Sequence, residues 1–161
     1  MIAKQRIGIV GAGMMGHGIA KNLVEKGFPL AVRGHRSRAP IDDLVGRGAT
    51  EVKTNADLAR ASDIVILCVT GAPQVEEVMF GPEGVAGAAR PGTIVVDTST
   101  SEPATTAKMR EALAKQDVRF VDAPLARTPV EAEQGRLNTM VGADDATFAE
   151  LKPVFAAYCE N

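Results

Sequence analysis

The chain has 161 residues, which is enough for one domain with a hydrophobic core but too few for two large domains. Hydrophobic residues make up 45% of the chain and charged residues 24%, a composition typical of globular proteins. The formal net charge of -2 argues against a nucleic-acid-binding protein, which would need a surplus of basic residues on one face.

Short apolar runs alternate along the chain with amphipathic segments, and no internal repeat or low-complexity stretch interrupts them. The runs are rich in Val and Ile and almost continuously apolar, which is typical of strands buried on both faces of a parallel sheet. We therefore predict strands over Ile7–Val10, Phe28–Val32, Ile64–Val69, Thr93–Asp97, Val118–Val121 and Leu137–Val141.

Helical segments fit between these strands. Gly27 is a good stop residue for the first helix, Asp42 and Asp43 suit the first turn of the second, and Asn55 is a candidate N-cap for the third. The predicted helices are Met14–Lys26, Ile41–Gly46, Asn55–Arg60, Pro73–Phe80, Glu102–Lys115 and Asp145–Tyr158. This alternation predicts an α/β fold over residues 1–161, namely a Rossmann-type, doubly wound, mostly parallel sheet with helices on both faces.

The sequence shows no targeting or metal-binding pattern. Residues Met1–Arg6 lead directly into the first predicted strand without a signal peptide, and the apolar runs are too short to cross a membrane. Cys68 lies in an apolar run and Cys159 near the last residue, with no spacing typical of a disulfide or a zinc site. We therefore expect a cytoplasmic protein without a metal, a membrane or a nucleic acid as partner.

The strongest motif follows the first predicted strand and has the form GxGxxG, Gly11-Ala12-Gly13-Met14-Met15-Gly16. In a dinucleotide-binding loop, Gly11 permits the tight turn, Gly13 lets the backbone approach the pyrophosphate, and Gly16 lets the helix pack closely on the sheet. The pyrophosphate then lies on the free N–H groups at the helix N-terminus. The alternative is a glycine-rich turn without a ligand, which the flanking strand and helix disfavour.

The end of the second predicted strand indicates which cofactor binds. No Asp or Glu stands there to accept hydrogen bonds from the ribose 2′-OH of NAD. Arg36 is the best candidate to bind the 2′-phosphate of NADP, with Ser37 as a neutral donor and Arg38 or Arg33 assisting. We therefore predict NADP, with NAD less favoured. The alternative is that these arginines are solvated surface residues.

Several segments beyond the three glycines form a recognisable pattern. Residues 11–27 have the sequence GAGMMGHGIAKNLVEKG, and they are followed by His35-Arg36-Ser37, Asp97-Thr98-Ser99-Thr100, Asp122-Ala123-Pro124, Gly135 and Met140-Val141-Gly142. Along the whole chain these segments resemble the β-hydroxyacid dehydrogenases, and residues 11–27 are similar to the opening signature of that family. The family includes 3-hydroxyisobutyrate dehydrogenase, tartronate semialdehyde reductase and, more distantly, 6-phosphogluconate dehydrogenase.

The resemblance implies roles for several of these residues. His35-Arg36-Ser37 is similar to the Asn-Arg-Thr of the NADP-using members. Further cofactor contacts are implied at Val69, Thr70 and Thr100, and Ser99 is a candidate substrate contact. Ser99 and Thr100 follow a predicted strand, at the sheet edge where ligands bind in open α/β folds. On residue type alone, they could equally be turn and cap residues.

One segment departs from the family pattern. Members usually continue Asp-Ala-Pro with Val-Ser-Gly-Gly, whereas this chain has Leu125-Ala126-Arg127-Thr128, which is more similar to the sulfolactaldehyde reductase branch. Because a planar guanidinium suits a carboxylate or sulfonate, Arg127 and Thr128 are candidate substrate-binding residues for a small anionic substrate. The alternative is that Arg127 is an exposed residue on a loop.

The resemblance also implies a catalytic Lys on a long helix and an all-helical second domain that forms a homo-oligomer. The chain ends at Asn161, before that region, so we expect a dinucleotide-binding domain with no catalytic residue of its own and no turnover in isolation. The predicted enzyme is an NAD(P)-dependent dehydrogenase moving a hydride between NADP(H) and a small 3-hydroxy acid or its semialdehyde. The alternatives are an imine-reductase-like enzyme or a non-catalytic cofactor-binding module.

Overall fold

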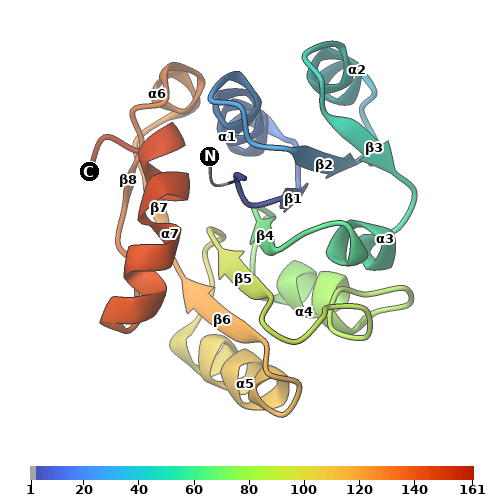
Figure 1. Ribbon diagram of the computed structural model, residues 1–161, viewed down its shortest axis with the longest axis vertical. Coiled ribbons are helices and arrows are strands. Elements are labelled where there is room, and N and C mark those ends of the chain that lie inside the picture. Colours follow the sequence, from blue (N-terminus) through green and yellow to red (C-terminus); the bar gives the residue numbers. More distant parts are fainter. Residues whose placement is uncertain (1–2) are drawn as a thin grey trace.

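Six parallel strands form the central sheet of the computed structural model, which describes residues 3–161 (Figure 1). The strands are β1 (Ile7–Val10), β2 (Leu30–Arg33), β3 (Thr50–Val52), β4 (Ile64–Leu67), β5 (Ile94–Asp97) and β6 (Arg119–Asp122). Their order in the sheet is β3-β2-β1-β4-β5-β6, and every neighbouring pair is parallel. The predicted Rossmann-type, doubly wound fold is therefore confirmed.

Helices cover both faces of this sheet (Figure 1). One hydrophobic cluster packs one sheet face against α1 (Met14–Glu25), α2 (Ala39–Gly46), α6 (Pro129–Gln134) and α7 (Asp145–Tyr158). A second cluster packs the other face against α3 (Asn55–Arg60), α4 (Ala72–Phe80) and α5 (Pro103–Ala114). Side chains of β4 alternate between the clusters, with Ile64 and Ile66 in the first and Val65 and Leu67 in the second. Burial on both faces explains why this strand is apolar throughout.

The predicted strand Leu137–Val141 is wrong in its length and its partner. Only Asn138–Thr139 is extended as β8, and it pairs antiparallel with β7 (Leu125–Ala126) in a separate two-stranded sheet. Leu137 is fully buried, but its N–H donates to the carbonyl of Tyr158 (3.1 Å). The end of α7 therefore binds this segment, and the central sheet ends at β6.

The beginnings of α3 and α2 differ from the sequence-based expectations. The N-cap of α3 is Thr54, whose side-chain oxygen accepts from the N–H of Asp57 (2.9 Å), and Asn55 is already helical. Helix α2 begins two residues before the predicted Ile41, because Pro40 suits its first turn. Asp43 consequently lies beyond the first turn, where it contacts side chains instead of stabilising the helix dipole.

Among the helices of residues 3–161, none combines the length and the hydrophobicity that crossing a membrane requires. Met1 and Ile2, which the sequence analysis places before the first strand, lie outside the described residues.

Candidate nucleotide-binding site

The glycine loop connects β1 to α1 at the carboxyl edge of the sheet. Gly11 has a φ of +99°, and a Cβ there would lie 2.1 Å from the carbonyl oxygen of Cys68, so the loop needs glycine for conformation and for space. A Cβ on Gly16 would lie 1.7 Å from the carbonyl oxygen of Gly11, which explains the close approach of helix and turn. The loop thus lies beside β4, at the point where the strand order reverses and ligands bind in such folds.

The start of α1 fits a pyrophosphate. Its N-cap is Gly13, no side chain caps the helix, and the first turn carries no acidic residue. A Cβ on Gly13 would meet no atom within 4 Å, so open space lies in front of this part of the loop. The first N–H groups of a helix lack intrahelical partners, so those of α1 are available to a ligand. Gly13 and Met14 are both exposed there.

Three arginines follow β2, but the structure gives them different environments. Arg33 donates to the side-chain oxygen of Asn55 (3.2 Å), and Arg38 donates to Asp42 (2.9 Å) and Glu51 (3.0 Å). Arg36 is exposed and has no hydrogen bond or ion pair with any residue in 3–161. Arg36 is therefore the arginine of this segment whose guanidinium is open to a ligand.

An acidic side chain from a different strand does lie near the end of β2. Glu51, on the neighbouring strand β3, is the register partner of Val32, and its carboxylate lies 2.8 Å from where a Cβ of Gly34 would be. The hydrogen bond and charge of Arg38 lower the pKa of Glu51, so this carboxylate is ionised and paired. Glu51 is not apparent from the sequence pattern, because β3 was not among the predicted strands.

The loops after β4 and β5 are joined by the residues that the sequence singled out. Ser99 is buried, and its hydroxyl oxygen accepts from the N–H of Val69 (3.0 Å). Asp97, fully buried, accepts from the N–H of Ser99 (2.9 Å) and from the hydroxyl of Ser101 (2.7 Å). Thr100 is exposed beside this turn. Asp97 and Ser99 thus shape the edge of the site, while Thr100 faces open space.

Two carboxyl groups end the adjacent strands β5 and β6. Asp97 and Asp122 are register partners. Burial raises the pKa of Asp122, the negative charge of Asp97 raises it further, and Arg110 partly offsets both effects. This edge of the site therefore combines small hydroxyl groups with an acidic pair.

Arg127 and Thr128 lie beyond β7, close to the end of α7. Arg127 has a φ of +86°, and its Nη1 donates to the carbonyl of Arg136 (2.7 Å) and contacts the carboxylate of Glu160. Thr128 is the N-cap of α6 and forms a capping box with Glu131. An anionic substrate would therefore have to compete with Glu160 for Arg127, and Thr128 has a structural role in α6.

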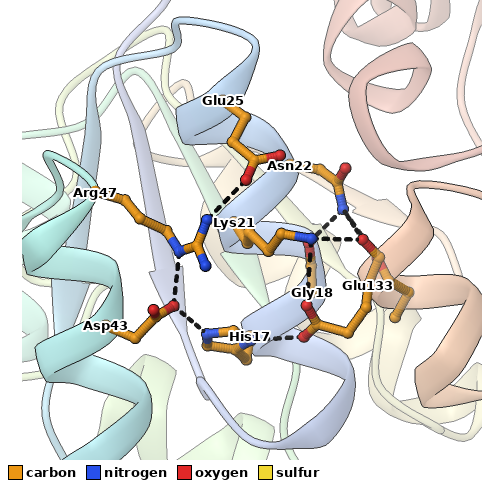
Figure 2. A network of polar contacts seen from close by, with 9 residues as sticks. His17, Gly18, Lys21, Asn22, Glu25, Asp43, Arg47 and Glu133 are labelled. Carbon is orange, nitrogen blue, oxygen red and sulfur yellow. Dashed lines mark hydrogen bonds and ion pairs between the residues drawn. The ribbon is translucent and has the colours of Figure 1, made fainter.

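Sequence reasoning also missed a polar network on α1 (Figure 2). His17 contacts Glu133 of α6 through Nδ1 (2.6 Å) and Asp43 of α2 through Nε2 (2.8 Å). Asp43 also accepts from Arg47 (2.8 Å), and Lys21 donates to the carbonyl of Glu133 (2.8 Å). The network connects the helices that follow the glycine loop, the arginine segment and Thr128.

Comparison with known proteins places this arrangement in a family. Residues 6–161 match the family described as the NAD binding domain of 6-phosphogluconate dehydrogenase. The chain belongs to this family. The expected membership of the β-hydroxyacid dehydrogenases is thereby confirmed, and so is its NAD(P)-binding character.

Individual members have related names. The chain is 37% identical over 151 residues to a 2-(hydroxymethyl)glutarate dehydrogenase of Eubacterium barkeri, covering 94% of the chain and 50% of that protein. It is 35% identical to a 2-hydroxy-3-oxopropionate reductase of Escherichia coli, and this match covers 97% of the chain and 53% of that protein. The crystal structure of a 3-hydroxyisobutyrate dehydrogenase from Salmonella typhimurium superposes with a TM-score of 0.91 at 30% identity. The match covers 98% of this chain and 55% of that one.

The chain thus spans about half the length of the curated relatives it matches. The relatives named here are dehydrogenases or a reductase by name, and the chain corresponds to the NAD-binding domain of this family.

Proposed function

We propose that this domain binds NADP(H) in preference to NAD(H), and that it serves an oxidoreductase acting on a small 3-hydroxy acid or its semialdehyde. In this proposal the pyrophosphate lies on the loop from Gly11 to Gly16, with His35, Arg36 and Ser37 around the 2′-phosphate. Val69, Thr70 and Thr100 contact the nicotinamide half. The bound cofactor would supply or accept the hydride, while the chain's own groups hold it in place.

The observation that carries the cofactor preference is the environment of Arg36. Its guanidinium is exposed and unpaired within residues 3–161, whereas Arg33 and Arg38 are bound to neighbouring groups. Glu51, which β3 brings to the end of β2, is paired with Arg38, so it is not a free acceptor for the ribose 2′-OH of NAD. A free arginine beside a neutralised acid favours a phosphate over a hydroxyl group.

Titration of the purified domain with NADPH and NADH by calorimetry tests this preference. Arg36→Ala removes one charge-assisted contact, worth about 1.5–3 kcal/mol, and should weaken NADPH binding by about ten- to a hundredfold. NADH affinity should stay unchanged, because NADH lacks the 2′-phosphate. Arg60→Ala, which removes an exposed arginine of α3 paired with Asp57, is the matched control and should leave both affinities unchanged. Equal wild-type affinities for the two cofactors would contradict the proposal.

The substrate part of the proposal rests on Arg127 and Ser99 near the carboxyl edge and on the names of the relatives. We further propose that a helical domain, which supplies the proton-transfer Lys and the homo-oligomer contacts, completes the enzyme. Addition of a separately expressed helical domain should then restore NADPH oxidation with a small anionic semialdehyde. Turnover of a cyclic imine instead would favour the imine-reductase alternative.

A further inference from the structure

His17 lies where three helices meet, each of which follows a segment that the proposed function assigns to ligand binding. It is on the second turn of α1, which follows the glycine loop. Its partner Asp43 belongs to α2, which begins directly after the segment of Arg36. Its other partner, Glu133, belongs to α6, which begins directly after Arg127 and Thr128. Figure 2 shows the imidazole between the two carboxylates, with α2 on one side and α6 on the other.

The geometry specifies the protonation state of this imidazole. Nδ1 lies 2.6 Å from an oxygen of Glu133 and Nε2 lies 2.8 Å from an oxygen of Asp43. A neutral imidazole has one N–H and one acceptor nitrogen, whereas ionised carboxylates only accept. Both contacts are therefore hydrogen bonds only when His17 is an imidazolium. Deprotonation would place a nitrogen lone pair against a carboxylate and break one of the two links.

The surrounding charges favour the same state. Asp43 is also bound by Arg47, which reaches Glu25 (2.7 Å), and Glu133 is also close to Lys21 (3.5 Å). Three carboxylates thus face two permanent cations, and a protonated His17 makes the network neutral. Burial lowers the pKa of His17, but the hydrogen bonds and charges of Glu133 and Asp43 outweigh it, so that the pKa is raised.

The imidazole remains accessible to protons. Its side chain is 20% exposed, and it borders an open groove of about 640 Å³ beside the glycine loop. The lining of this groove combines the loop residues Gly13 and Met14 with His17 and both of its carboxylate partners, and Ala39, Pro40 and Pro129 complete it. These residues belong to α1, α2 and α6 or to the glycine loop, so a shift of α2 or α6 at this point would move the segments that precede them.

We propose that His17 is a proton-dependent positioning residue for the nucleotide. This inference rests on the proposed NADP(H) binding. The imidazolium links α2 and α6 to α1 by hydrogen bonds, and it thereby fixes the position of the Arg36 segment relative to the glycine loop. When His17 loses its proton, α2 or α6 is released and the nucleotide binds more weakly. Because coupling between two binding events is reciprocal, NADP(H) binding then draws a proton onto His17.

The test measures NADPH affinity by calorimetry between about pH 6 and about pH 9, a range that spans the ordinary pKa of histidine. The wild-type affinity should fall as the pH rises through the pKa of His17. His17→Gln, which cannot be protonated, should bind about fivefold more weakly at the acidic end and lose this pH dependence. Repeating the titration in buffers of different ionisation enthalpy should show proton uptake by the wild type and less uptake by the variant. NADH serves as a second ligand, because the 2′-phosphate of NADPH titrates near pH 6 itself.

Two further variants separate positioning from the simple attraction of a positive charge for an anionic cofactor. Asp43→Ala and Glu133→Gln both remove negative charge near the glycine loop. A pure charge effect would make NADPH bind more tightly in both variants. Loss of the Asp43 link, and replacement of the charge-assisted Glu133 link by a weaker bond to a neutral amide, should instead make it bind more weakly. Glu76→Gln, which removes a carboxylate from the ion pair with Lys108 between α4 and α5, is the matched control and should leave NADPH affinity unchanged.

The outcomes distinguish this inference from the proposed function. If the wild type binds neither NADPH nor NADH at any pH, the proposed function fails, and the positioning role fails with it. If the wild type binds NADPH but His17→Gln has the same affinity and pH profile, only the positioning role is overturned. Tighter binding by Asp43→Ala and Glu133→Gln would overturn it as well. If His17→Gln does not fold, the NADPH affinities of Asp43→Ala and Glu133→Gln and the proton uptake of the wild type still test the positioning role.

Discussion

Gly18 controls how closely α6 approaches α1, and Gly18→Ala should destabilise the domain. A Cβ at this position would lie 2.5 Å from the carbonyl carbon of Ala132 and 2.8 Å from its oxygen. The obstacle is backbone, so α6 would have to move away by about 1 Å to restore ordinary contact distances. The side-chain amide of Asn22 spans the same interface, because it donates to the carbonyl of Ala132 in α6 (2.9 Å) and to that of Gly18 in α1 (2.8 Å).

Two opposing effects determine the magnitude. Alanine is a better helix former than glycine by about 1 kcal/mol, which favours the variant. Overpacking costs about 1–3 kcal/mol, and rigid backbone on the opposite side places Gly18→Ala at or above the upper end. The net loss should be about 2 kcal/mol, which lowers Tm by about 4–8 °C for a domain of this size.

Thermal unfolding followed by circular dichroism measures this loss. Gly46→Ala in α2 is the matched control, because a Cβ there meets no atom within 4 Å. The same chemical change should therefore stabilise the protein at position 46, by about 0.5–1 kcal/mol from helix propensity alone. A Gly18→Ala variant as stable as the wild type would refute the reasoning that α6 lies at contact distance.

Two other predictions concern stability at low pH and the substrate. Hydrogen bonds from Arg6 lower the pKa of Asp63 to about 2, so its ionised form stabilises the fold above its unfolded pKa of about 3.9. This stabilisation is lost as the pH falls from about 4 to about 2; Asp63→Asn should lack it, so that urea titrations of wild type and variant converge towards the acidic end. Arg127→Ala, in an enzyme that carries this domain, should lower kcat/KM for an anionic substrate by about ten- to a hundredfold without changing NADPH affinity. Loss of NADPH binding instead would identify Arg127 as a cofactor residue.

Strands that are buried on both faces could be predicted from the sequence, whereas the edges of the fold could not. Ile64–Leu67 is apolar throughout because each residue packs against one of the two clusters, so composition alone indicates a strand. β3 is short and mostly exposed, with the sequence Thr-Glu-Val, and it is extended because Glu51 pairs with Val32 of β2. Such a strand depends on its neighbour, and no local pattern indicates it. α6 did have a local signal, since Thr128 and Glu131 have the spacing of a capping box.

The candidate site divides in the same way. The glycine loop is a local motif, so its position between a strand and a helix could be predicted from the sequence, while its binding of a nucleotide stays a prediction. The His17 network joins residues 26 and 116 positions apart, and it exists only because α6 packs against α1. That packing is possible because Gly18 has no side chain and because the amide of Asn22 binds α6. Glu133 therefore reaches His17 only while α6 is in contact with α1. The two sets of experiments are therefore linked. If α6 is displaced in Gly18→Ala, the carboxylate of Glu133 moves away from His17. The pH dependence of NADPH affinity should then weaken together with the thermal stability of the domain. A variant that is destabilised yet keeps the full wild-type pH dependence would show that Asp43 alone holds the imidazolium.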